Sequence, residues 1–515
     1  MRTTLLNSVS ALALLTMTGM AYAGGNNATI EQTSDVENSS ANVTQTGTSG
    51  VAHIKQGVYA SGYYPGYVNE GSSVTIEQSG NGGIAFTYQT SVSDEHQDIK
   101  QIDGGRIDAE QLFSERSTQT ISQVDGGEIV AGQEFGTNDS SQKITQSNGG
   151  SATIAQIGTV SSTQKTEQVS GGRLDAWQWY GNNDAHQEIV QIDGGVIYAH
   201  QSDSTVSSQV VRQERGGNVW ASQEFVNGGF QSIYQSGNNQ VEALSLLSNE
   251  VRTSIDQIGT GNTALLYQGA SVYLSTPGLF GRDASGSWAE ITQYGNQNKG
   301  ILEQVGLAGT ASIYQSGELN EGRVLQKGAG DYALLGQWGT GNKGKVIQDA
   351  DTVHATVTQN GQGNETTITQ TGLGSHTTLS QLGDVNKTTL AQSGLNDWAT
   401  IVQDGAHQTL SLTQSADSVT ATINQYGQDN SATLSQSGST SDILVTQNGT
   451  DNTANLTQTA DNNSWASIAQ TGRENEATLT QAGSANWAVV TQSGDGNAAT
   501  LDQQGTGNTA TITQF

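Results

Sequence analysis

The sequence predicts an all-β fold: a β-solenoid of about 22-residue strand-turn-strand-turn units with stacked Gln and Asn side chains. The prediction depends on three features. Glutamines recur at a constant interval, residues alternate between two faces in the arms that separate them, and a glycine often lies two positions after the glutamine. One such unit, called a rung below, cannot cover its own apolar face, so neighbouring rungs must stack.

The glutamine period is clearest in the C-terminal half. From Gln293 to Gln514 there are twenty intervals, of which nineteen are eleven residues long and one is twelve. Composition alone would suggest disorder, because only 33% of residues are apolar and the net charge is −29. The strict repetition argues against disorder and for a repeat architecture.

Upstream, the period persists with unequal arms. One set of glutamines recurs every 22 or 23 residues, and a second set lies four residues before the first, which makes the true repeat two arms long. The first set is Gln101, Gln123, Gln146, Gln168, Gln191, Gln213 and Gln235, and the second is Gln97, Gln119, Gln142, Gln164, Gln187, Gln209 and Gln231.

Alternation within each arm predicts strands. In 497–503, Asn497, Ala499, Leu501 and Gln503 share one face, and the residues between them share the other. Helices are disfavoured, because the arms are rich in Thr, Ser and Asn and are interrupted by glycine. Segments such as 494–496 (Gly-Asp-Gly) are typical of turns.

The regular amides are expected to lie at the edges of a core filled by small and aliphatic side chains. An unpaired buried amide is costly, but an amide stacked on an identical amide can donate to one neighbour and accept from the other. The predicted structural ladder comprises Gln359, Asn364, Gln370, Gln381, Asn386, Gln392, Gln425, Asn430, Gln436, Gln447, Asn452, Gln458, Gln481, Asn486, Gln492, Asn497, Gln503, Asn508 and Gln514.

The N-terminus has the pattern of a secretion signal. Arg2 precedes a mostly apolar run over 5–20 and a small-x-small site at 21–23, so we expect a signal peptide over 1–23 and an exported mature chain. The run is too short to span a membrane, and no later segment is a candidate. We further predict an irregular N-terminal segment over 24–96, a solenoid of DGG-type repeats over 97–235 and a more regular solenoid over 236–515.

Three irregularities interrupt the repeat. Loops are expected at 58–73 and 269–292, around the only two prolines, Pro65 and Pro277. Leu246 stands where a glutamine is expected. At the C-terminal end the arm 508–514 follows the motif without an atypical polar rung over it, and we expect its edge to be open to further strands.

Signals for chemistry are weak, and the sequence predicts no catalytic, cofactor-binding or metal site. The seven histidines lack metal-ligand spacing, and acids in turns, such as Asp193, leave calcium binding as a minor alternative to a role against premature association. With 48 acidic and 19 basic residues, nucleic acid is an unsuitable partner. Five tryptophans could bind a glycan, but cross-strand stacking is favoured: Trp177, Trp220, Trp398, Trp465 and Trp487.

The spacing Ser-x5-Gln-x-Gly-x-x-Asn-x-Ala-x3-Gln resembles the curlin repeat of curli amyloid subunits. It is met by Ser441, Gln447, Gly449, Asn452, Ala454 and Gln458, and, with Thr388 in place of Ala, by Ser375, Gln381, Gly383, Asn386 and Gln392. The resemblance covers roughly 235–515. It implies a secreted subunit of extracellular amyloid fibres on a Gram-negative bacterium. It also implies self-assembly, with a curli-type secretion channel, a periplasmic chaperone and a nucleator subunit as partners. The open strand edge predicts that this self-assembly is head to tail.

Three functions compete on these features. The first is a curli-like fibre subunit for biofilm matrix and adhesion. The second is a monomeric ice-binding or surface-adhesive β-solenoid, but its Thr-x-Thr pairs at 367–369, 478–480 and 511–513 are too irregular. The third, a polysaccharide-acting enzyme, lacks clustered acids and bases. The first is the prediction.

Overall fold

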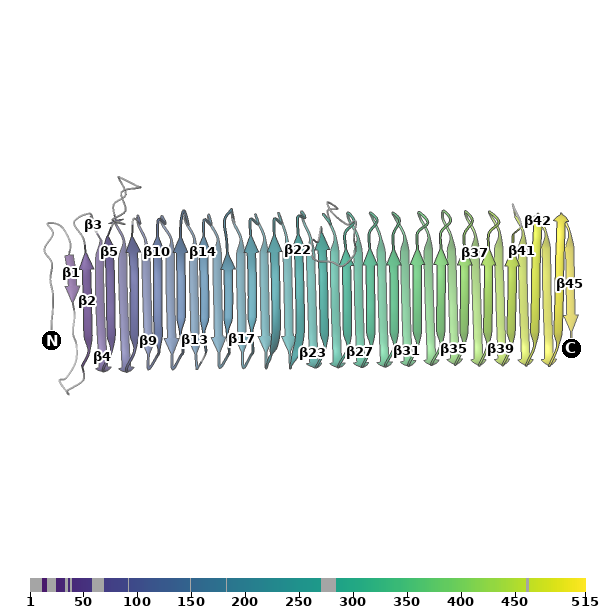
Figure 1. The fold of residues 1–515 in the computed structure, drawn as a ribbon, viewed down its shortest axis with the longest axis horizontal. Helices are drawn as coiled ribbons and strands as arrows, with labels where there is room; N and C mark the ends of the chain where they lie inside the picture. Colours follow the sequence, from purple (N-terminus) through teal and green to yellow (C-terminus); the bar gives the residue numbers. More distant parts are fainter. Residues whose placement is uncertain are drawn as a thin grey trace. The chain divides into compact units, whose positions relative to one another are not determined.

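The computed structural model describes residues 12–15, 25–32, 36–37, 39–57, 69–90, 92–148, 150–181, 183–269, 284–459 and 463–515. All regular structure in these ranges is β-strand, and every strand pair for which a register is defined is parallel. The chain divides into two compact units, Met1–Val251 (unit 1) and Arg252–Phe515 (unit 2). Each unit is built on two long parallel sheets whose strands alternate along the chain, which confirms the predicted β-solenoid (Figure 1).

Unit 1 contains two long sheets and one short pair, β3 (Val36–Glu37) with β6 (Asn69–Glu70). Sheet A1 contains β1 (Leu12–Leu15), β4 (Ser40–Thr48), β7 (Ser73–Asn81), β9 (His96–Ile102), β11 (Thr118–Val124), β13 (Ser141–Ser147), β15 (Thr163–Val169), β17 (His186–Ile192), β19 (Ser208–Glu214) and β21 (Phe230–Ser236). Sheet B1 contains β2 (Asn27–Gln32), β5 (Val51–Gly57), β8 (Ile84–Thr90), β10 (Arg106–Leu112), β12 (Ile129–Glu134), β14 (Ala152–Ile157), β16 (Leu174–Gln178), β18 (Ile197–Ser202), β20 (Gly217–Glu224) and β22 (Asn239–Leu246).

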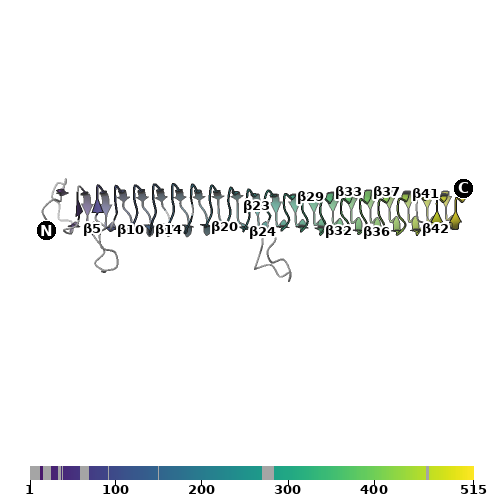
Figure 2. The same cartoon turned by 90° about the horizontal axis from the view of Figure 1, so that it is seen from above.

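Unit 2 has the same plan with more regular strands, and Figure 2 shows its two sheets as separate layers. Sheet A2 contains β23 (Arg252–Thr260), β25 (Trp288–Asn296), β27 (Thr310–Glu318), β29 (Tyr332–Thr340), β31 (His354–Gln362), β33 (His376–Asp384), β35 (Trp398–Ala406), β37 (Thr420–Gln428), β39 (Asp442–Thr450), β41 (Trp465–Arg473), β43 (Trp487–Asp495) and β45 (Thr509–Gln514). Sheet B2 contains β24 (Thr263–Gly269), β26 (Lys299–Gln304), β28 (Glu321–Gln326), β30 (Lys343–Gln348), β32 (Glu365–Gln370), β34 (Lys387–Gln392), β36 (Thr409–Gln414), β38 (Ser431–Gln436), β40 (Thr453–Gln458), β42 (Glu476–Ser484) and β44 (Ala498–Thr506).

Equivalent residues of successive rungs pair in register. Gln425 pairs with Gln447 in sheet A2, and Leu434 pairs with Leu456 in sheet B2. The alternating residues point into a thin core, in which Ile423, Leu434 and Leu456 are at most 2% exposed. Because the strands pair in register, each rung places a side chain directly over its counterpart, at the spacing of about 4.8 Å between parallel strands.

In each rung, two short connecting segments, called arcs below, join a strand of one sheet to the next strand in the other sheet. Unit 1 differs from unit 2 at one of these arcs. A single residue of each arc forms an isolated parallel bridge to the next rung, which makes a column through Glu70, Ser93, Glu115, Asn138, Val160, Asn183, Thr205, Asn227 and Asn249. This bridge column occupies the longer return arm seen in the sequence.

Two expectations need correction. Residues 288–292, expected to lie in the second loop, form the first half of β25, because Ala289 and Ile291 are buried and pair in register with β27. Leu246 is not at the glutamine position: Gln223 pairs with Ser245, so the serine replaces the glutamine.

Other N-terminal and loop expectations fall largely outside the described residues. These are the signal peptide apart from β1, the part of the first loop over 58–68 with Pro65, and the part of the second loop over 270–283 with Pro277. The expected loop bounds were too wide, because Asn69–Glu70 form β6, Ser73 begins β7 and Gly269 ends β24. The predicted segment boundaries stay predictions.

Candidate functional site: stacked amide columns

Two continuous columns of hydrogen-bonded glutamines run through unit 2, one per sheet. In sheet A2 each Nε2 donates to the Oε1 of the glutamine one rung onward at 2.5–2.9 Å, from Gln257 through Gln293, Gln315, Gln337, Gln359, Gln381, Gln403, Gln425, Gln447, Gln470 and Gln492 to Gln514. In sheet B2 the distances are 2.7–3.3 Å, from Gln268 through Gln304, Gln326, Gln348, Gln370, Gln392, Gln414, Gln436, Gln458 and Gln481 to Gln503.

The glutamine side chains also hydrogen-bond to backbone carbonyls near them in the chain, as Gln447 shows. Gln447 is fully buried and accepts from Gln425 Nε2 at 2.8 Å. Its own Nε2 lies 2.9 Å from the carbonyl oxygens of Ser431 and Asn452, besides Gln470 Oε1. The side chain therefore bridges the strand before it and the arc after it, so its buried polar atoms are satisfied.

The asparagines do not form a simple copy of the glutamine ladder. Asn452 Nδ2 donates to Asn430 Oδ1 at 3.0 Å, toward the preceding rung, and to the Gly472 carbonyl at 3.0 Å in the following rung. Asn452 Oδ1 accepts the backbone N–H of Asn475 at 3.2 Å. The asparagines thus hydrogen-bond mainly to backbone groups of the arcs that connect the two sheets.

The predicted asparagines fall into two arcs. Asn364, Asn386, Asn430, Asn452 and Asn497 lie after strands of sheet A2, in a column where Gln408 replaces asparagine. On the opposite arc, Asn508 donates its backbone N–H to Asn486 Oδ1 at 3.0 Å.

The predicted ladder leaves out members that the structure adds to these columns. In unit 2 these include Asn298, Asn320, Asn342 and Asn475, each five residues after a glutamine, so the spacing could have identified them.

Unit 1 has three glutamine columns rather than two. Sheet A1 has two, from Gln97 to Gln231 at 2.5–2.9 Å and from Gln45 to Gln235 at 2.6–3.2 Å. Sheet B1 carries the third, from Gln32 through Gln56, Gln89, Gln111, Gln133 and Gln156 to Gln178 at 2.6–3.4 Å. The predicted ladder leaves this third column out, although its members from Gln89 onward recur every 22 or 23 residues, so the spacing could have identified them.

Glycine is required where the arcs of successive rungs approach closely. Gly449 has φ +139°, and a Cβ built there would lie 1.9 Å from the carbonyl oxygen of Gly472. Gly405, Gly427 and Gly494 occupy the same column, also at positive φ. Glycine is the only amino acid that can adopt this positive φ and also leave space for the carbonyl of the next rung, because it has no Cβ.

Three buried acids, Glu95, Asp331 and Asp397, each lie one residue before a strand of sheet A1 or A2, at the corner where the rung turns into that strand. Burial raises the pKa of Glu95 to about 8, of Asp331 to about 7 and of Asp397 to about 6, although backbone N–H groups at each carboxyl lower it. The Val353 N–H donates to Asp331 Oδ1 at 3.3 Å. Neighbouring rungs place Ser375 and Ser441 at the position of Asp331 and Asp397, so the acid is not required by the fold.

The five tryptophans singled out in the sequence all make ring contacts with neighbouring aromatic residues. Trp398 stacks on His376 with ring centroids 4.2 Å apart, and Trp465 stacks on Trp487 at 4.0 Å. In unit 1, Trp177 stacks on Trp179, and Trp220 contacts Tyr198 edge-on. Cross-strand ring contacts are therefore confirmed for Trp220, Trp398, Trp465 and Trp487, whereas Trp177 stacks on a residue of its own arm.

β45 is the outermost strand of sheet A2. Its side chains alternate between the core face and the outer face as in other strands, but those on the core face are not fully buried. Ala510, Ile512 and Gln514 alternate with exposed threonines but stay partly exposed, because within the described ranges no strand covers their outer side. Trp487 N donates to the Asn508 carbonyl at 2.8 Å. In this parallel register the backbone N–H groups of Thr509, Thr511 and Thr513 point away from β43.

The repeats match a known family. The curlin-associated repeat matches residues 354–383, 417–449, 449–483 and 483–515, all within unit 2. Unit 2 contains curlin-associated repeats. These repeats, together with the solenoid fold, suggest a curli-type structural subunit.

Other comparisons and site searches add little to this assignment. No curated protein matches the curlin-repeat chain. In the part of the chain that the structure describes, no helix is long and apolar enough to cross a membrane. Nor do the described side chains include a group of three or more His, Cys, Asp or Glu placed to hold a metal ion.

Proposed function

We propose that the protein is a secreted structural subunit that self-assembles into extracellular curli-like amyloid fibres and contributes to biofilm matrix and adhesion. The observation that carries the proposal is the pair of unbroken glutamine columns in unit 2. Every rung presents the same buried donors and acceptors at the same register. A rung from a second copy could therefore extend the columns with the bonds already used within the chain.

Assembly in this proposal is head to tail. The outer side of β45 offers unpaired backbone groups and a partly exposed Ile512, and a strand edge of this kind recruits further strand. Gln514 accepts from Gln492 at 2.9 Å and donates to the Ala498 carbonyl at 2.8 Å. The first well-formed rung of another copy would continue this column.

The sequence supports the proposed route to the fibre. The expected signal peptide and the absence of cysteine fit export of an unfolded chain. We extend the proposal to a Gram-negative cell surface, a curli-type secretion channel, a periplasmic chaperone and a nucleator subunit. Exposed acids of the arcs, such as Asp429 and Asp451, would limit association before folding.

The test uses mature chain, residues 24–515, released from denaturant and incubated. We expect β-rich fibres that bind amyloid dyes, with a fibre-diffraction reflection at about 4.8 Å along the fibre axis. A matched variant carrying Gln425→Ala and Gln447→Ala should assemble more slowly. A folded monomer that stays soluble and dye-negative for days at high concentration would favour the alternative, a monomeric ice-binding or surface-adhesive solenoid.

A further inference from the structure

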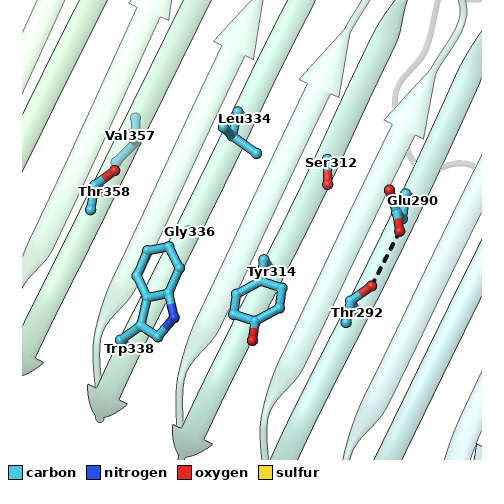
Figure 3. A pocket seen from close by; sticks show the side chains of 9 residues that line it. All are labelled: Glu290, Thr292, Ser312, Tyr314, Leu334, Gly336, Trp338, Val357 and Thr358. Atoms are coloured by element: carbon cyan, nitrogen blue, oxygen red, sulfur yellow. Dashed lines mark hydrogen bonds between the residues drawn. The ribbon is translucent and has the colours of Figure 1, made fainter.

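A hollow of about 290 Å³ interrupts the outer face of sheet A2 in unit 2. It forms where Gly336 takes an outward-facing position, between Tyr314 and Thr358 on the neighbouring strands. Its lining also includes Glu290, Thr292, Ser312, Leu334 and Trp338 (Figure 3). Because Gly336 has no side chain, it leaves room on this face for a neighbouring ring.

The missing side chain lets the Trp338 ring lie down over Gly336. A Cβ built on Gly336 would lie 2.5 Å from two atoms of the Trp338 ring. The rings of Trp338 and Tyr314 are 5.3 Å apart, with an angle of 36° between their planes. Figure 3 looks onto the sheet and shows both rings face on, so they form a platform whose faces are turned outward.

This arrangement is unlike the aromatic columns elsewhere in unit 2. His376 and Trp398 lie 4.2 Å apart with 14° between their planes, so each ring covers the face of its neighbour. Trp465 and Trp487 are stacked in the same way. Stacked rings offer their edges to a ligand, whereas the Trp338–Tyr314 platform offers its faces, which carry the negative potential of the ring.

The groups around the platform are hydrogen-bonding and include a carboxylate but no base. Glu290 accepts from Thr292 at 3.4 Å and is half-buried, and the hydroxyls of Ser312 and Thr358 lie in the same lining. The carboxylate, together with a net charge of −29, disfavours an anionic ligand. The combination of flat aromatic faces and hydroxyl partners suits a ligand with apolar C–H faces and many hydroxyls.

We propose that this groove binds a neutral, unbranched polysaccharide whose pyranose rings stack on Trp338 and Tyr314. The sugar hydroxyls bond to Glu290, Ser312 and Thr358. Because the two rings come from neighbouring strands, the saccharide runs across the strands of sheet A2. The site lies on the outer face of the sheet, so its occupation is independent of strand addition at β45.

The experiment titrates end-labelled cellohexaose with the full mature chain and follows fluorescence anisotropy. Wild-type protein should bind saturably, and Trp338→Ala should weaken binding at least tenfold. Gly336→Thr should do the same, because the new Cβ displaces the Trp338 ring. The second variant should still fold, since threonine occupies the equivalent position in the next rung (Thr358) and favours strands.

Trp398→Ala is the matched control, since it removes another exposed tryptophan of sheet A2 that lies outside the groove, and it should leave binding unchanged. A wild-type chain that does not bind, or a Trp338→Ala variant that binds as well as wild type, would overturn the proposal. Selective binding of a de-N-acetylated chito-oligosaccharide would also overturn it, since Glu290 would then be recognising an amine. Urea midpoints measured on each variant separate loss of binding from loss of folding.

Discussion

Gln447 donates to Gln470 across a rung that is one residue longer than its neighbours, yet the distance is 2.9 Å, as elsewhere in the column. The extra residue lies between Gln458 and Trp465, outside both strands. The strands on either side keep their register, with Asp442 pairing with Trp465. Register is therefore set by the strands and their buried amides, and the arcs absorb changes in length.

Replacing Gln447 by alanine should destabilise unit 2 more than replacing the adjacent Thr446. The alanine removes the two N–H groups that Gln447 Nε2 shares among three acceptors and leaves the Gln425 amide without its acceptor, at a cost of about 1–3 kcal/mol. Thr446 is a half-buried side chain of the outer face, and its alanine variant should change stability by no more than about 0.5 kcal/mol. Urea unfolding of the two variants and of wild type measures the difference. Equal effects would mean that the glutamine column contributes little to the free energy of unfolding.

Substitution of Gly449 by alanine should be among the most damaging single changes in unit 2. The residue has φ +139°, and the added Cβ would meet the Gly472 carbonyl oxygen at 1.9 Å. Backbone strain of this kind costs about 1–3 kcal/mol, and the steric overlap adds to it. We expect a loss of more than about 2 kcal/mol in urea unfolding.

The matched control is Gly363→Asp. Gly363 has φ +63°, and equivalent corners hold Val385, Asp429 and Asp451 at φ 58°, 53° and 57°. The nearest atom to a Cβ at this position is 3.7 Å away. Stability should change by no more than about 0.5 kcal/mol. If both glycine variants were equally stable, close contact between arcs would not be the reason for glycine.

The sequence predicted the solenoid and most members of the unit 2 columns, because a strict period of identical buried residues determines which side chains stack. Gln447 above Gln425 is a direct consequence of the 22-residue repeat. The direction of the asparagine bonds was not predictable, since Asn452 bonds to carbonyls whose positions depend on arc geometry. The platform at Trp338 also could not be foreseen, because it depends on one glycine, Gly336, and on a ring orientation.

Raising the pH through neutrality should destabilise the folded chain. Burial raises the pKa of Asp331 to about 7 and of Asp397 to about 6, whereas both would titrate near about 4 when unfolded. The folded state therefore binds more protons in this window, and stability falls as pH rises from about 4 through 7. Urea midpoints should be higher at pH 5 than at pH 8, and Glu95 contributes in the same direction.

The double variant Asp331→Ser, Asp397→Ser isolates this effect in unit 2. Serine occupies the same corner in neighbouring rungs, as at Ser375, so the fold should be retained. We expect greater stability than wild type at pH 8 and a smaller difference between the two pH values. Asp442→Ser, which removes an exposed acid, is the control. An unchanged pH dependence in the double variant would show that these carboxyls are ionised at little cost.

Proline at Thr511 should slow fibre elongation while leaving the internal rungs formed. The Thr511 N–H points away from β43, so proline removes a donor only from the outer side of the strand. Ala510→Pro is the matched comparison, since the Ala510 N–H points toward β43 and its loss should also weaken the last rung. Seeded elongation rates and the far-ultraviolet circular dichroism of the soluble chain separate the two effects. Elongation of Thr511→Pro at the wild-type rate from both seed ends would show that β45 is not the growth edge, and head-to-tail stacking through it would have to be abandoned.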